Sequence, residues 1–209
     1  MPARRAPTPR GVAVSAQVAP RAALSKPGLG LALTIDATRY ARDLIREVPD
    51  FPSPGVLFRD LTPLLADPKA FALVTDSLAS RFVGEAIEAV VAIESRGFIF
   101  GAAIAQRLNL SFVPVRKPGK LPRQVHQVGY ALEYGEAQLQ MHCDALRPGA
   151  QVLVIDDLLA TGGTASAAGE LVRQQGATVA AYVFVVELLG LAGRAALEPT
   201  PVLSLIQCE

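Results

Sequence analysis

Apolar residues along this chain alternate between short continuous runs and spacings of three or four residues. Uninterrupted apolar runs, typical of strands buried on both faces, occur at residues 89–93, 112–115, 152–155 and 179–186. Helical spacing of apolar residues predicts helices at residues 37–48, 67–82, 100–108 and 165–175. The repeated strand-then-helix order predicts an α/β fold: a doubly wound, mainly parallel sheet flanked by helices.

A different pattern covers residues 121–141. Val128, Tyr130, Leu132 and Tyr134 recur at every second position, which predicts an antiparallel ribbon. A long insertion between sheet strands commonly moves over a ligand, so we expect this ribbon to act as a flexible lid.

The first 33 residues are basic and rich in proline and alanine, and the first acidic residue of the chain is Asp36. They lack the apolar periodicity needed to pack, so we expect one domain at residues 34–209, preceded by a separate tail at residues 1–33. Two interpretations of the tail stay open. Disorder is favoured by the composition, and an organelle transit peptide would also be rich in arginine and poor in acids.

Size and composition narrow the class of protein. At 209 residues the chain is long enough for one domain that buries about 70% of its unfolded surface. A formal charge of +1 without a dense basic stripe argues against a nucleic-acid partner. Two isolated cysteines, Cys143 and Cys208, form no zinc or disulfide pattern, so we expect a cytoplasmic location. The longest apolar run falls short of the roughly 20 residues of a membrane helix, so we expect no membrane partner.

The strongest chemical signal follows the strand at residues 152–155. Asp156 and Asp157 come next, which would place two carboxylates at the ligand-binding edge of the sheet, where they fit ribose hydroxyls. Ala160, Thr161, Gly162, Gly163 and Thr164 then lead into a helix. Glycines and hydroxyls before a helix N-terminus favour an anion site. The alternative is an ordinary strand-to-helix turn.

Two further segments carry cations beside strand ends. Ser95 and Arg96 follow the strand at residues 89–93, and an arginine fork suits a polyanion, with Gly97 allowing close approach to it. Arg116, Lys117 and Lys120 follow the strand at residues 112–115. The alternatives are a helix cap with a solvated arginine and a solvated charge run.

The proline-rich segment at residues 50–60 is irregular and aromatic. It could present a flat wall and backbone donors to a planar base, through Leu57, Phe58 and Arg59. The alternative is a packed loop, and we interpret Phe51 as a core residue.

These motifs together resemble a known family. Residues 152–172 are similar to the phosphoribosyl pyrophosphate (PRPP) signature of the type I phosphoribosyltransferases, and the lysine of a nucleoside-triphosphate P-loop is missing. The segments DFPSPGVLFRDLTPLL, ESRGFIFG, RKPGKLP, LEYG and VIDDLLATGGT occur in that order. They resemble the adenine-specific branch over residues 36–209.

The resemblance implies transfer of the 5-phosphoribosyl group from PRPP to adenine, giving AMP and pyrophosphate in purine salvage, by a homodimer, with Mg²⁺ carried by PRPP. It implies that residues 160–164 bind the 5′-phosphate and that Asp156 and Asp157 accept ribose hydroxyls. The implied pyrophosphate ligands are Ser95, Arg96, Arg116, Lys117 and Lys120. Leu57, Phe58 and Arg59 would bind adenine, Glu133 would manage the base proton, and Tyr134 would help close the site. A solvated ribbon glutamate is the alternative for Glu133.

Two rival functions stay open. A regulator could keep the PRPP fold as a sensor, but it would need a DNA-binding surface that the sequence does not indicate. Within the enzymes, the rival is a transferase for a 6-oxopurine such as hypoxanthine or xanthine.

Overall fold

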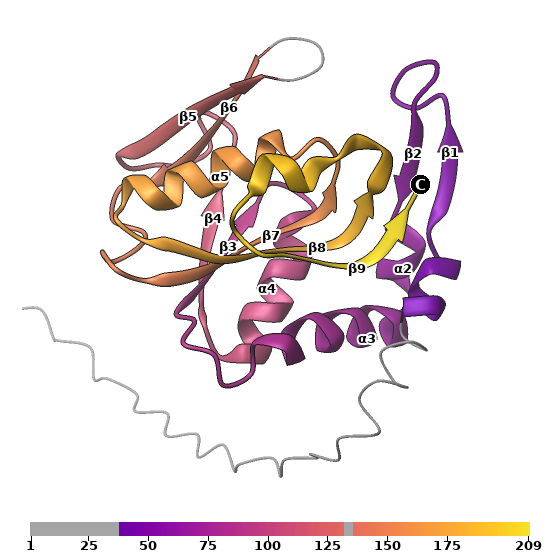
Figure 1. The fold of residues 1–209 in the computed structure, drawn as a ribbon, viewed down its shortest axis with the longest axis horizontal. Coiled ribbons are helices and arrows are strands. Elements are labelled where there is room, and N and C mark those ends of the chain that lie inside the picture. Colours follow the sequence, from indigo (N-terminus) through magenta and orange to yellow (C-terminus); the bar gives the residue numbers. More distant parts are fainter. Residues whose placement is uncertain (1–37, 132–135) are drawn as a thin grey trace, which may run out of the picture.

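A five-stranded parallel sheet forms the centre of the molecule (Figure 1). The computed structural model describes residues 38–131 and 136–209. The strand order is β4-β3-β7-β8-β9. The strands are β3 (Ala89–Ile93), β4 (Ser111–Val115), β7 (Gln151–Leu159), β8 (Thr178–Leu188) and β9 (Val202–Cys208). The predicted parallel sheet flanked by helices is confirmed.

Helices cover both faces of the sheet, which explains the continuous apolar runs. Helices α3 (Pro68–Ala79) and α4 (Gly97–Leu108) lie on one face, and α5 (Gly163–Gln174) lies on the other (Figure 1). Because successive strand residues point to opposite faces, Leu153 packs in the cluster under α4 while Val152 and Val154 pack in the cluster under α5. Two apolar cores therefore fix the orientation of the strand that leads into the anion-binding motif.

Two antiparallel hairpins project from opposite ends of the sheet (Figure 1). One pairs β1 (Arg46–Pro49) with β2 (Leu57–Asp60), and the other pairs β5 (Val125–Ala131) with β6 (Glu136–His142). The second confirms the predicted antiparallel ribbon. The short remaining elements are α2 (Thr62–Ala66), η1 (Ser80–Phe82), η2 (Leu189–Leu191) and η3 (Gly193–Leu197).

The helix predicted at residues 37–48 is wrong in its second half. Helical structure covers residues 38–43, and the chain then enters β1. Val48 is β-branched and pairs across the hairpin with Phe58, so strand pairing overrides the helical spacing of the apolar residues. The next helix agrees with the sequence: Asp67 caps α3 by accepting a bond from the amide of Ala70 at 2.8 Å.

The strand predicted at residues 152–155 continues to Leu159, because Asp156, Leu158 and Leu159 keep pairing with β8. The two carboxylates therefore lie within β7 and not after it. The tail predicted at residues 1–33 lies outside the described residues. Among the helices that the structure describes, none combines the length and apolarity that a bilayer crossing requires.

Candidate functional site

The turn from β7 into α5 forms a small cradle at the carboxyl edge of the sheet. Gly162 adopts a left-handed backbone (φ +85°), and α5 begins at the next residue, two positions earlier than the sequence predicts. The cradle encloses about 70 Å³ and is lined by Asp156, Leu158, Leu159, Ala160, Thr161, Gly162, Gly163, Thr164, Ala165 and Phe184. The first-turn amides and the positive end of the helix dipole favour an anion at this place. The structure thus brings all five predicted loop residues around one cavity.

The two carboxylates beside the cradle differ in their surroundings. Asp157 is 4% exposed, and its side chain accepts a bond from the Nε of Arg96. Asp156 accepts a bond from the amide of Asp157 at 2.9 Å. Burial, and then the negative charge of Asp157, raise the pKa of Asp156 well above its usual range. One carboxylate of the pair is thus partnered by an arginine, and the other retains its proton more tightly than an ordinary aspartate.

Gly97 has a packing role that the sequence does not indicate. A Cβ at this position would lie 2.7 Å from Oδ1 of Asp156 and 3.0 Å from the carbonyl oxygen of Ile155. The missing side chain therefore lets α4 begin directly against β7, and the close ligand approach expected at Gly97 stays a prediction. Ser95 and Arg96, just before this helix, are exposed at the same edge.

The predicted cationic loop is held by an acid that the sequence analysis missed. Arg116 donates two hydrogen bonds to the carboxylate of Glu94, at 3.0 and 3.2 Å. The same carboxylate accepts a hydrogen bond from the backbone amide of Lys117 at 3.0 Å. The hydrogen bonds from Arg116 hold the pKa of Glu94 below its usual value. Lys117 and Lys120 are exposed. Of the three cations, Arg116 thus has a partner within the chain, while the lysine side chains face solvent.

A groove of about 480 Å³ joins the cradle to the β1–β2 hairpin. Its lining includes Val56, Leu57, Phe58 and Arg59 from the hairpin, Arg96, and Leu158, Ala160, Thr161 and Thr164 from the cradle side. The guanidinium of Arg96 lies 5.3 Å from the centre of the Phe58 ring. The groove therefore offers an apolar and aromatic wall with a cation at one side, next to an anion cradle.

Two residues that line this groove were not predicted from the sequence, and the core position predicted for Phe51 is wrong. Leu188 and Leu191 complete the apolar wall from the end of β8 and the turn that follows it. Phe51, expected in the core, is 52% exposed and meets Phe58 edge to face, with ring centres 5.1 Å apart. The pattern around Phe51 contains only prolines and small residues, which give no periodic signal of burial.

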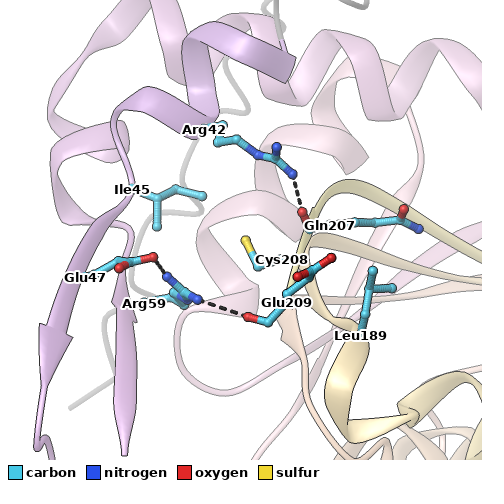
Figure 2. A pocket seen from close by; sticks show the side chains of 8 residues that line it. All are labelled: Arg42, Ile45, Glu47, Arg59, Leu189, Gln207, Cys208 and Glu209. Atoms are coloured by element: carbon cyan, nitrogen blue, oxygen red, sulfur yellow. Dashed lines mark hydrogen bonds and ion pairs between the residues drawn. The ribbon is translucent and has the colours of Figure 1, made fainter.

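The side chain of Arg59 also lines a neighbouring cavity of about 580 Å³, where its guanidinium lies between Glu47 and Glu209 (Figure 2). It pairs with Glu47 and donates to the backbone carbonyl of Glu209 at 3.2 Å, and Arg42 donates to the carbonyl of Gln207. Its Nε is buried without a hydrogen-bond partner. Only the backbone and the side-chain stem of Arg59 can therefore face a ligand in the groove.

The ribbon approaches the cradle from the other side. Val128, Gly129 and Tyr130 line a cavity of about 480 Å³ together with Thr161 and Gly163. Glu133 and Tyr134, which the sequence analysis places in the site, lie outside the described residues. The described part of the ribbon is positioned next to the loop that it was expected to cover.

Comparison with known proteins gives one consistent result. The model of the phosphoribosyl transferase domain matches residues 61–200. The adenine phosphoribosyltransferase of Sorangium cellulosum is 57% identical over 194 residues, which are 88% of this chain and 97% of that protein.

Solved structures agree with the sequence relatives. The adenine phosphoribosyltransferase of Thermoanaerobacter pseudethanolicus has a TM-score of 0.80 and 45% identity, over 82% of this chain and 99% of that one. The Saccharomyces cerevisiae enzyme, complexed with an imino-altritol bisphosphate and adenine, has a TM-score of 0.77 and 40% identity, over 82% and 99%.

Proposed function

The chain belongs to the phosphoribosyltransferase family, and within it to the adenine phosphoribosyltransferases, and we propose that it transfers the 5-phosphoribosyl group of PRPP to N9 of adenine. The products are AMP and pyrophosphate, in purine salvage. One observation carries the proposal: a single groove joins an anion cradle to an aromatic wall, as a phosphorylated sugar and a flat base together require. The yeast relative binds adenine and a bisphosphate together.

The reaction forms the bond from N9 to C1′ and breaks the bond from C1′ to the pyrophosphate oxygen, with inversion at C1′. Early departure of pyrophosphate leaves positive charge on the ribose ring. The enzyme then contributes mainly by holding base, sugar and leaving group in line and by stabilising the departing charge.

The cradle residues Ala160, Thr161, Gly162, Gly163 and Thr164 would bind the 5′-phosphate. Asp156 and Asp157 would accept the ribose hydroxyls. Asp157 is paired with Arg96, and the raised pKa of Asp156 limits repulsion between the two acids. The support for this assignment is that both acids lie beside the cradle on the same strand.

Pyrophosphate would be held by Ser95 and by the cations Arg96, Arg116, Lys117 and Lys120. Arg96 and Arg116 each have an acidic partner, Asp157 and Glu94. These acids orient the guanidinium groups before substrate arrives, and a guanidinium has further donors for phosphate oxygens. Arg116 also lies over the ring of Phe98, at 5.9 Å.

Adenine would lie in the groove against Phe58, with the backbone groups of Leu57 and Arg59 binding its polar edge. The engagement of the Arg59 side chain with Glu47 supports a backbone role for this residue. Glu133 would manage the base proton and Tyr134 would help the ribbon close over PRPP.

Mg²⁺ would enter with PRPP. Asp156 and Asp157 are hard oxygen donors of the kind that Mg²⁺ prefers, but one is paired with Arg96 and the other has a raised pKa. We therefore assign the metal to the oxygens of PRPP, where it would neutralise pyrophosphate charge.

A cytoplasmic homodimer that binds neither nucleic acid nor membrane completes the proposal. An exposed apolar patch on α4 and the edge strand β4 supports the dimer. Ile99 is 41% exposed and Phe112 is 38% exposed, and Phe112 packs edge to face with Phe98.

The experiment is a substrate panel with PRPP and Mg²⁺ that measures pyrophosphate release. Adenine has a donor at N6 and an acceptor at N1, and hypoxanthine reverses both. A buried site that matches one pattern can discriminate by about 10⁴- to 10⁵-fold in kcat/KM. Comparable efficiency with hypoxanthine would reject the adenine assignment, and no turnover with any purine would leave a PRPP-binding regulator.

A further inference from the structure

The segment at residues 189–197, which we call the strap, runs from the end of β8 past both parts of the site. Leu191 lines the groove proposed for the base, as does Leu188 just before the strap. Gly193 and Ala196 lie against the phosphate cradle. The strap therefore contacts the places proposed for both substrates, although it carries none of the motifs that predict chemistry.

The strap and the cradle touch backbone to backbone. A Cβ on Gly162 would lie 2.5 Å from the carbonyl oxygen of Gly193 and 2.9 Å from the Cβ of Ala196. A Cβ on Gly193 would overlap the carbonyl oxygen of Ala160. Since the nearest atoms on both sides are backbone oxygens, a movement of the strap must be accommodated by the cradle.

One arginine holds the strap in place. Arg194 binds the carboxylate of Glu187 through two bonds, at 2.6 and 2.7 Å. It also donates to the carbonyl of Val202 at 2.8 Å and to the hydroxyl of Ser204 at 2.9 Å. Glu187 is 3% exposed and lies two residues before the strap, at the end of β8. The strap is thus tied both to its own strand and to β9.

The electrostatics of Glu187 agree with a specific ion pair to Arg194. The hydrogen bonds from Arg194 hold the pKa of Glu187 below its usual value despite the burial of this acid. Ser204 donates to the same carboxylate, so the acid has partners on the strap and on β9. A buried carboxylate with this many donors has one preferred geometry.

We propose that Arg194 and Glu187 are positioning residues of the transfer reaction, which act on the 5′-phosphate cradle and the base groove through the strap. Neither side chain lines the cradle or the groove. Their effect is on where Gly193 and Leu191 lie. The inference rests on the function proposed above, and the wild-type protein tests that function separately.

The test compares Arg194→Met and Arg194→Lys with Arg107→Met. Arg107 is a matched control because it pairs with Asp76 at 2.5 Å and has similar exposure, 48% against 42%, but lies on α4 away from the site. For each variant, kcat and both KM values are measured well below the unfolding temperature. We expect Arg194→Met to raise the KM for PRPP and for adenine by about ten- to a hundredfold, the range for misplaced positioning groups.

Arg194→Lys keeps the charge but loses the two-bond fork, so its KM values should lie between those of wild type and Arg194→Met. A purely stabilising pair would lower the unfolding midpoint and leave both KM values of the folded enzyme unchanged. KM values for Arg194→Met equal to those of Arg107→Met would overturn the proposal. If Arg194→Met does not fold, Glu187→Gln, which keeps the shape of the acid, is compared in its place with the same two outcomes.

Discussion

Gly162 at the start of α5 offers the sharpest test of the cradle. Its backbone is left-handed, with φ +85°, and its surroundings leave no room for a side chain. Replacing it with alanine adds a single methyl group, which would meet the carbonyl oxygen of Gly193 at 2.5 Å. The cradle or the strap must shift, so the change affects both folding and phosphate binding.

The unfolding free energy that Gly162→Ala loses has two parts that can be measured separately. A left-handed backbone costs an L-residue about 1–2 kcal/mol, and overpacking a close-packed contact costs about 1–3 kcal/mol, so Gly162→Ala should lose about 2–5 kcal/mol of unfolding free energy. Gly84 separates the parts, because it has φ +87° and a methyl group added there would meet nothing within 4 Å. Gly84→Ala should lose only the backbone part, and the change in unfolded-chain entropy is the same in both variants.

Urea unfolding gives the two free energies, and steady-state assays with varied PRPP give KM. We expect Gly162→Ala to be less stable than Gly84→Ala by about 1–3 kcal/mol. Its KM for PRPP should rise about tenfold or more while that of Gly84→Ala stays at the wild-type value. Equal stability and equal KM in the two variants would refute the packing of Gly162 against Gly193 and the assignment of the cradle.

Three further predictions concern the acids and the tail. Because the pKa of folded Asp156 is raised, its contribution to stability is present at low pH and is lost as pH rises from about 4 through the raised value. Asp156→Asn should therefore gain in urea midpoint relative to wild type at pH 8 but not at pH 4, while transfer falls. Asp157→Asn abolishes the ion pair with Arg96, so kcat/KM should fall, and wild-type kinetics would exclude the pair from the site. Deleting residues 1–33 should preserve kcat/KM and, by light scattering, the proposed dimer, and loss of either would show that the tail packs on the domain.

The strands of the sheet could be predicted because both of their faces are buried. Residues 89–93 and 152–155 read as apolar runs for that reason. The two acids after the second run correctly predicted the edge of the sheet. They did not predict the end of β7, because pairing with β8 continues through these positions to Leu159. Residues 46–49 were misassigned because their strand depends on a partner several positions further along the chain, which local spacing does not reveal.

The site motifs could be predicted individually, but their pairings could not. Arg96 and Asp157 are 61 residues apart and meet only through the order of the strands. The strap could not be predicted from the sequence, because its contact with the cradle is made by the backbone of Gly193 and the acid that anchors Arg194 lies on the preceding strand. Glu187 could have been found as a lone acid that ends an apolar run, at a position where burial requires a partner.

The cavity in Figure 2 also has a consequence for the order in which the protein assembles. Apart from Phe184 of β8, the residues that line the phosphate cradle come from one continuous segment, β7 through α5. The hairpin that forms the base groove is held instead by Arg59 on Glu209, and the helical segment just before it by Arg42 on Gln207; these contacts join residues 150 and 165 positions apart. Contacts of such long range form late in folding. During refolding, binding of a phosphate group at the cradle should therefore return before affinity for adenine, and the rate of adenine binding would report the docking of the hairpin on β9.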